Sequence, residues 1–177
     1  MLNEKRVKEA EGNIKRYLED GLLWKFKMSR NEVMETYQRN YKESLDVAQK
    51  IFDQNLSNLW VIVISYYSMY YIANAVLYKI GYKIGSKVSH KVTADALIVF
   101  VRNKLKKEFL EEYEEAKEEA MEIIGRKTDE IIESFDQELE KRSVFQYEST
   151  EEIKRAKANT SLDRAKRFIF EMKKLLP

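Results

Sequence analysis

Helix-breaking residues are almost absent from this chain of 177 residues. It has five glycines and one proline, and that proline, Pro177, is the last residue. Glycine and proline are the strongest signals for turns and element ends, so their scarcity makes helix the default prediction throughout. We therefore expect an all-α fold, an antiparallel bundle of about four to six helices.

Apolar residues recur every three to four positions through most of the chain, which is the spacing of a helix that covers a core on one side. Two predicted helix starts carry the capping-box pattern, Ser29 with Glu32 and Ser149 with Glu152. Ser57 opens another helix, which is apolar on most sides and should therefore lie at the centre of the bundle.

That central segment, LWVIVISYYSMYYIANAVLY (59–78), is also long enough to span a bilayer. We favour a buried helix instead, because Ser65, Ser68, Asn74 and the five tyrosine hydroxyls of the segment are costly in hydrocarbon. The remaining helices are amphipathic and need an apolar partner to cover.

The segment GYKIGSKVS (81–89) is the best loop candidate. It holds two of the five glycines together with several short polar residues. Ser89, at its end, could cap the helix that follows.

Residues 104–142 form a long charged tract with an apolar seam. Its length favours one extended helix, or a helical hairpin broken near Gly125, that projects as a partner-binding arm; two ordinary bundle helices are the alternative. The acidic cluster EFLEEYEEAKEEAMEI within it is predicted to be a solvated helix face.

Basic and acidic residues almost balance, at 32 and 30, so that the formal net charge is +2. No global field would draw the protein to nucleic acid or to an acidic membrane, and any such binding must be local. The chain lacks cysteine, and its charged first twenty residues do not resemble a secretory signal. We expect a single helical domain over 1–177, located in the cytoplasm.

Motifs for most familiar catalytic and cofactor sites are missing. The sequence has no Gly-rich phosphate loop, no HExxH and no G-x-S-x-G, and its one histidine, His90, cannot supply a histidine metal cluster. A ferritin-like di-iron site would require two histidines. We therefore expect neither a metal nor a cofactor.

One region carries a family pattern. YYSMYYIANAVLYKIGYK (66–83) is followed by a short loop and then by SHK (89–91) at the start of the next helix. This order resembles the central segment of HEPN domains, in which a tyrosine pair precedes small residues and a Ser-His follows the loop. A preceding helix, YQRNYKESLDVAQKIFDQNL, and the closing KRSVFQYESTEEIKRAKANTSLDRAKRFIFEMKKLL are similar to the family too, so the resemblance covers residues 30–176.

The resemblance implies a helical bundle that forms a homodimer, in nucleotide- or RNA-related prokaryotic systems of the toxin–antitoxin type. A minimal nucleotidyltransferase, often encoded beside such proteins, is the implied partner. Active family members are metal-independent ribonucleases with an arginine followed, four to six residues on, by a histidine. The arginine maps onto Arg142, but Tyr147 stands in the place of the histidine.

This difference bears on catalysis. A histidine near its pKa can take a proton from a ribose 2′-hydroxyl and return one to the leaving oxygen, whereas a tyrosine with an ordinary pKa of about 10 is a poor base. Arg142 alone can hold a phosphate but cannot move protons. The pair also fits a plain helix end and turn, in which Arg142 stabilises the last carbonyls and Tyr147 packs inward.

His90 also allows two interpretations. It can be structural, as a cap or as a ring bonded to a nearby backbone carbonyl. Alternatively, His90 with Lys87 and Lys91 receives an anionic ligand at the helix N-terminus, where exposed amides favour phosphate. The tyrosines of 59–78 are expected to pack in the core, because a base-stacking platform needs exposed rings beside a basic groove.

Three functions remain open from the sequence. We favour a non-catalytic HEPN-like module that binds a nucleotide, RNA or a nucleotidyltransferase partner. The second is an atypical metal-independent ribonuclease, in which Arg142 steadies the phosphate and Tyr147 or His90 handles the proton. The third is a structural homo-oligomeric assembly protein that uses the 104–142 tract for its subunit contacts.

Overall fold

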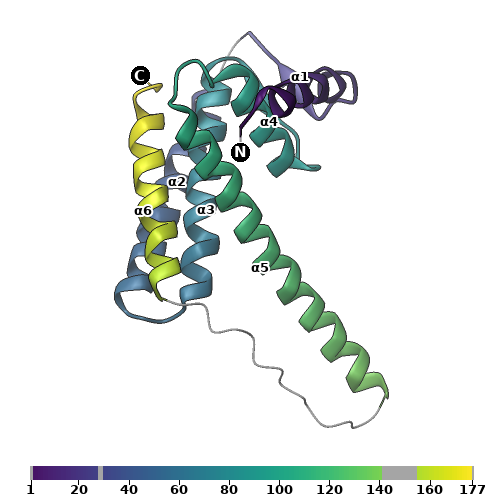
Figure 1. Ribbon diagram of the computed structural model, residues 1–177, viewed down its shortest axis with the longest axis vertical. Coiled ribbons are helices and arrows are strands. Elements are labelled where there is room, and N and C mark those ends of the chain that lie inside the picture. Colours follow the sequence, from purple (N-terminus) through teal and green to yellow (C-terminus); the bar gives the residue numbers. More distant parts are fainter. Residues whose placement is uncertain (1, 28–29, 141–154, 177) are drawn as a thin grey trace.

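The structure is a computed structural model that describes residues 2–27, 30–140 and 155–176; for residues 126–140 it describes the helical backbone. Six helices and two short strands occur in this part of the chain (Figure 1): α1 (Glu4–Glu19), β1 (Leu23–Lys25), α2 (Asn31–Asp53), α3 (Asn58–Lys79), β2 (Tyr82–Ile84), α4 (Ser89–Phe100), α5 (Lys107–Glu140) and α6 (Arg155–Lys173). The predicted all-α bundle is confirmed.

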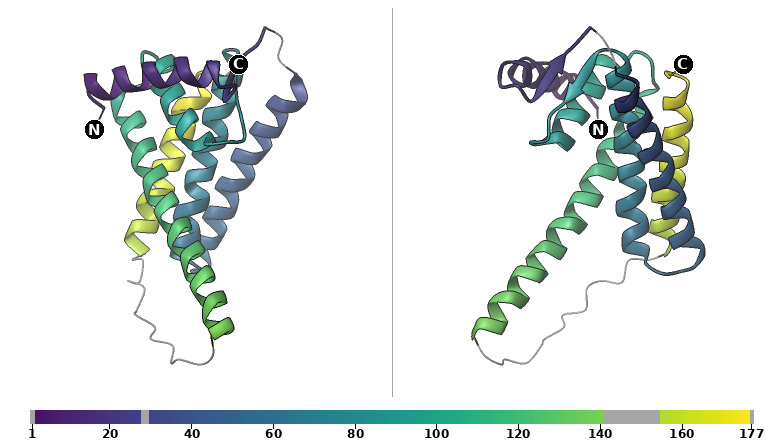
Figure 2. Two further views of the ribbon diagram at one scale, coloured as in Figure 1. Left: turned by 90° about the vertical axis from the view of Figure 1, so that its right-hand side faces the viewer. Right: turned by 180° about the vertical axis from the view of Figure 1, so that it is seen from behind.

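Helix α3 is the central helix, as its composition predicts. Its start is capped by Ser57, whose hydroxyl accepts a 3.3 Å hydrogen bond from the Trp60 amide. Helices α2 and α6 run alongside it and make its most extensive contacts, while α1 and α4 pair near the other side of α5 (Figures 1 and 2). Because α3 is covered from several directions, its apolar residues do not need to lie on one face.

Among the described helices, α3 alone is long and apolar enough to cross a membrane by length and composition. Its most apolar window is 67% buried inside the fold. Ser65, Ser68 and Asn74 within it are buried as well. The Ser68 hydroxyl donates to the Ser65 carbonyl, and the Asn74 amide donates to the Tyr70 carbonyl and to the Thr93 hydroxyl of α4. The helix therefore has the burial and bonding of a core helix.

The charged tract is one continuous helix, and the hairpin alternative is wrong. Helix α5 passes Gly125 without a break. Its first part packs on α3 through a seam that is buried at Phe109, Tyr113, Ala116 and Ala120. The helix then runs away from the bundle (Figures 1 and 2). Ile123, the next seam position, is partly buried against the cluster that contains Ala48, Val61 and Leu162. The seam positions after it lie outside the described side chains.

The acidic cluster of α5 lies on a partly exposed helix face, and several of its carboxylates pair with cations of α6. A guanidinium nitrogen of Arg164 lies 3.1 Å from a Glu115 carboxylate oxygen, and another lies 3.6 Å from Glu119. Arg167 lies 2.6 Å from Glu112. Exposed pairs of this kind contribute about 0–1 kcal/mol each, so their main effect is to fix which face of α6 meets α5.

Two short strands occur where the sequence predicted helix and loop. β1 and β2 pair antiparallel, and β2 lies inside the predicted loop GYKIGSKVS. Strands of three residues are too short to show an alternating pattern, which is why the sequence did not predict them. The register places these residues opposite each other: Leu23 and Ile84, Trp24 and Lys83, Lys25 and Tyr82.

One predicted helix cap is wrong. Helix α4 begins at Ser89 itself, so that Val88 precedes it in a left-handed conformation with φ 46°. Helix α2 begins at Asn31, after Arg30, whose side chain makes no cap hydrogen bond. Ser29 and the capping pattern at 149–152 lie outside the described residues.

Candidate functional site

The structure places the predicted site residues only in part. Arg142 and Tyr147 lie outside the described residues, and their role as a pair stays a prediction. The structure does describe His90, Lys87 and Lys91, which lie at the junction between the β2 segment and α4. The two lysines are exposed and His90 is partly buried.

His90 packs against the tyrosines of α3. Its Nδ1 shares a 2.7 Å hydrogen bond with the Tyr66 hydroxyl. The centroid of its ring lies 5.5 Å from the ring centroids of Tyr66 and Tyr67, and 4.5 Å from that of Tyr70. The observed partner of Nδ1 is thus a tyrosine hydroxyl rather than a backbone carbonyl. Tyr66 and Tyr70 are four residues apart on α3, so that both rings meet the His90 ring at the start of α4.

Burial keeps this aromatic cluster neutral. Desolvation, followed by the charge of Lys117 on α5, lowers the pKa of His90 below its ordinary 6.5. Burial likewise raises the pKa of Tyr66 and of Tyr113, whose rings lie 5.9 Å apart. At neutral pH the cluster is therefore an uncharged imidazole among protonated phenols, with Nδ1 of His90 already engaged.

The predicted packing of the α3 tyrosines in the core is confirmed. Tyr66 is 1% exposed and Tyr78 is 4% exposed. Tyr67, Tyr70 and Tyr71 are partly buried, and their rings pack on one another. None of these five rings is free enough to serve as a stacking platform for a base.

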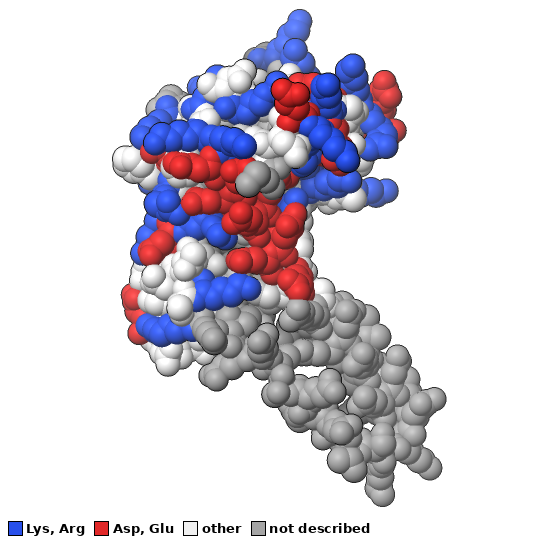
Figure 3. All heavy atoms as spheres, in the orientation of Figure 1, with Lys and Arg blue, Asp and Glu red and all other residues white. Residues whose placement is uncertain are grey.

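Lys87 and Lys91 belong to a larger basic surface around the two-stranded sheet. No acidic residue occurs between residues 21 and 31 or between residues 79 and 94. Lysine and arginine side chains gather at the upper end of the molecule, while Asp and Glu form a band along the middle (Figure 3). We call the following exposed residues the basic sheet surface: Lys25, Lys27, Arg30, Lys79, Lys83, Lys87 and Lys91.

The charges of the basic sheet surface are not compensated within the described chain. None of its seven members forms an ion pair with a described residue, although other surface cations do. An exposed tryptophan, Trp24, stands among them on β1 with 47% of its surface accessible. Uncompensated cations around an exposed aromatic ring are typical of a surface that binds nucleic acid.

A buried ionic network that was not predicted lies among α1, α4 and α5. Asp95 of α4 is fully buried, and its Oδ2 accepts 2.9 Å hydrogen bonds from the Asn13 amide and the Tyr17 hydroxyl. Its Oδ1 lies 2.6 Å from the Arg6 guanidinium, which also contacts Glu114 at 2.6 Å. The network thus ties α1 to α4 and α5, and the buried carboxylate of Asp95 is paired with a cation and with two hydrogen-bond donors.

The electrostatics of the network support a structural role. Burial opposes the charge of Arg6, but Glu114 and Asp95 raise its pKa above the ordinary value. Burial, followed by Asp95, raises the pKa of Tyr17. The sequence did contain one signal for this network, because Asp95 is the only charged residue in VTADALIVFV (92–101), and a lone carboxylate among apolar residues needs partners.

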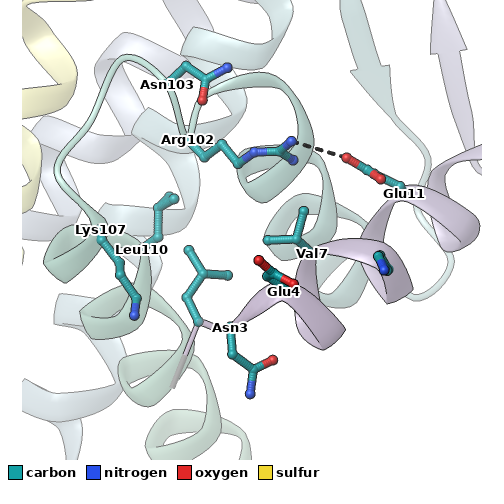
Figure 4. A pocket seen from close by; sticks show the side chains of 10 residues that line it. Asn3, Glu4, Val7, Glu11, Arg102, Asn103, Lys107 and Leu110 are labelled. Atoms are coloured by element: carbon teal, nitrogen blue, oxygen red, sulfur yellow. Dashed lines mark hydrogen bonds and ion pairs between the residues drawn. The ribbon is translucent and has the colours of Figure 1, made fainter.

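An open hollow of about 680 Å³ lies between α1 and the start of α5, apart from the residues that the sequence singled out. Figure 4 shows Val7 and Leu110 at its floor and Arg102 bonded to Glu11 at its side. Its charged residues are mixed in sign and include Glu4 and Lys107. This hollow offers neither a concentrated charge nor a titratable pair for chemistry.

No group of three or more potential metal-ligating side chains occurs within the residues that the structure describes. No protein-family model matches the chain, and no curated protein matches it either. The resemblance to HEPN domains accordingly stays a prediction from the sequence.

Proposed function

We propose that this protein is a HEPN-like, non-catalytic binding module whose ligand is RNA or another phosphate-bearing nucleotide. One observation carries the proposal: the seven uncompensated cations of the basic sheet surface, in a chain whose net charge is only +2. Such segregation keeps like charges together at an energetic cost, and contact with phosphates would offset it.

The environment of His90 supports a role without catalysis. A general base must reach the proton that it abstracts. His90 instead uses Nδ1 to bond Tyr66, and its ring packs on Tyr67 and Tyr70. We assign His90 to the packing of α4 on α3, while Lys87 and Lys91 beside it belong to the binding surface.

We also propose two protein partners, both implied by the HEPN resemblance. They are a second copy of this chain, in a homodimer, and a minimal nucleotidyltransferase, in a cytoplasmic toxin–antitoxin type system. The projecting part of α5 gives the assembly an extended helix outside the bundle (Figure 1), which is the geometry that an arm for a partner requires.

The test incubates the purified protein with structured and unstructured RNA in excess chelator and follows both cleavage and mobility shift. A Lys87→Glu/Lys91→Glu variant is compared with a Lys42→Glu/Lys50→Glu variant, which changes the same charge on the exposed part of α2. We expect a shift without cleavage that only the first variant loses. Cleavage that disappears in Arg142→Ala or His90→Ala would establish the ribonuclease instead, and equal shifts in both charge variants would refute binding at this surface.

A further inference from the structure

Trp24 lies on the solvent face of the two-stranded sheet. Side chains alternate along a strand, and the pair Leu23 and Ile84 is buried, at 1% and 8% exposure. On the same side as that pair, Tyr82 stacks on Phe100 of α4, with ring centroids 3.9 Å apart. Trp24 and the Lys83 opposite it therefore share the outer face.

The indole of Trp24 is seated against backbone at two glycines. A Cβ at Gly85 would stand 3.1 Å from Cη2 and 3.2 Å from Cζ3 of the indole, which is closer than side chains normally approach. A Cβ at Gly21 would stand 3.9 Å from its Nε1. The ring is thus supported on one side, and 47% of the residue remains exposed for contact on the other.

The charge around this ring has one sign. Lys83 lies directly opposite Trp24 across the strand pair and shares its face, while Lys25, the next residue of β1, is exposed at the other face of the strand. Trp24 is also the only large apolar side chain exposed on the two strands. A membrane-binding surface needs a broader apolar area than one ring. An unpaired nucleic-acid base fits this arrangement, because its flat face can stack on the indole while its flanking phosphates contact the cations.

We propose that the outer face of the β1–β2 sheet binds single-stranded nucleic acid, with a base stacked on Trp24 and phosphates held by Lys83 and the neighbouring cations. This inference rests on the proposed function for the class of ligand. It adds that the ligand is single-stranded and that Trp24 contacts one of its bases. A duplex is excluded from the stacking contact because its bases already stack on each other. Gly21 and Gly85 have no side chains, which leaves room for the Trp24 indole to lie close to the backbone.

The chain contains its own control for this proposal. It has two tryptophans, and the second, Trp60 at the start of α3, is 52% exposed. No lysine or arginine occurs from residue 54 to residue 64. A Trp60→Phe protein therefore reports on Trp24 alone by fluorescence, and a Trp24→Phe protein reports on Trp60 alone.

The experiment titrates both single-tryptophan proteins with oligo(U) and oligo(dT) of about 12 nucleotides, a length within the range of single-strand binding sites. We expect saturable quenching of Trp24 by either oligonucleotide and none of Trp60. In mobility shifts, Trp24→Ala should weaken binding by about 5- to 150-fold, the range that alanine substitution of stacking aromatics gives. Trp60→Ala should bind like the wild type.

Each other result overturns the inference in a distinct way. A mobility shift without quenching of Trp24 would leave the proposed function standing and refute the stacking contact. The absence of any oligonucleotide binding would refute both. Vesicles of anionic phospholipid form the last arm: a blue shift of Trp24 emission on these vesicles, without quenching by the oligonucleotides, would make the sheet a membrane-binding surface.

Discussion

Asp95 and the basic sheet surface differ in how their charges are compensated: Asp95 has partners within the fold, and the cations of the basic sheet surface have no ion-pair partner among the described residues. Asp95 is fully buried, and Arg6, Asn13 and Tyr17 together meet its two oxygens. Lys83 and the other cations of the sheet are exposed and have no acidic partner in the described chain. The buried charge is matched because desolvation is costly, whereas the exposed ones remain unmatched and free for a ligand. Whether a charged group has partners within the fold therefore separates a structural role from a binding role, whatever the number of charges in the cluster.

The largest expected effect comes from removing the matched charge. Asp95→Ala leaves Tyr17 and Asn13 without their acceptor and Arg6 with Glu114 alone. Loss of one partner from a buried pair costs about 3–5 kcal/mol, so the urea midpoint of unfolding should fall steeply.

The control for that variant is Asp163→Ala, because Asp163 on α6 is exposed and lies 3.9 Å from Lys166. Its unfolding free energy should stay within about 0.5 kcal/mol of the wild type. If Asp95→Ala unfolds at the same urea concentration as Asp163→Ala, the network has no structural role.

An intermediate effect is expected at the α5–α6 pairs, which are matched but nearer to solvent. Arg164 is 13% exposed and contacts Glu115 and Glu119. Arg164→Ala should lower the free energy of unfolding by about 1 kcal/mol, the upper end for exposed pairs, and thermal or urea unfolding would measure it. A loss as large as that of Asp95→Ala would mean that partial exposure does not weaken these pairs.

His90 provides a pH-dependent test of the aromatic cluster, whose side chains are uncharged and packed on one another. As the chain's only histidine it gives a single imidazole NMR signal, whose titration should report a pKa below the ordinary 6.5. Because the folded pKa is the lower one, the unfolded state binds more protons as the pH falls below about 6.5. The contribution of His90 to stability is therefore complete above that pH and is lost below it.

The variant to compare with the wild type is His90→Gln, because glutamine cannot take up that proton. The difference in unfolding free energy between wild type and His90→Gln should shrink as the pH drops from 7 toward 5. A titration at or above 6.5 would show that the ring is not desolvated by the tyrosines.

The smallest effect on stability is expected where charge is unmatched. Lys83→Glu/Lys87→Glu removes no ion pair and no side-chain hydrogen bond with a described residue, because both lysines are exposed, and it relieves repulsion among neighbouring lysines. Its free energy of unfolding should lie within about 0.5 kcal/mol of the wild type, while RNA mobility shift should weaken strongly. A large loss of stability would show that these lysines hold the fold and would remove the contrast with Asp95.

Much of the fold was predictable from local patterns. The scarcity of glycine and proline predicted helices, and the all-round apolar character of 59–78 predicted a central helix, because these signals need no knowledge of distant residues. Ser57 was predictable as a cap for the same reason. The strands were not, because β1 and β2 are three residues long and pair across about sixty intervening residues.

The candidate surface was only half predictable. The lysines near His90 are visible in the sequence. They form one surface with Lys25 and Lys27 only because β1 pairs with β2. The position of Trp24 on the outer face follows from its register opposite Lys83, which the sequence alone does not reveal. The roles of Arg142 and Tyr147 stay predictions, since both lie outside the described residues.

The most direct test of the central claim, that the unmatched cations bind a polyanion, is the salt dependence of oligo(U) affinity. Each cation that contacts a phosphate of a single strand adds about −0.7 to the slope of log K against log salt concentration. We predict a negative slope that becomes less steep by about 1.4 in Lys83→Ala/Lys87→Ala and stays unchanged in Lys42→Ala/Lys50→Ala. Equal slopes in all three proteins would contradict the account.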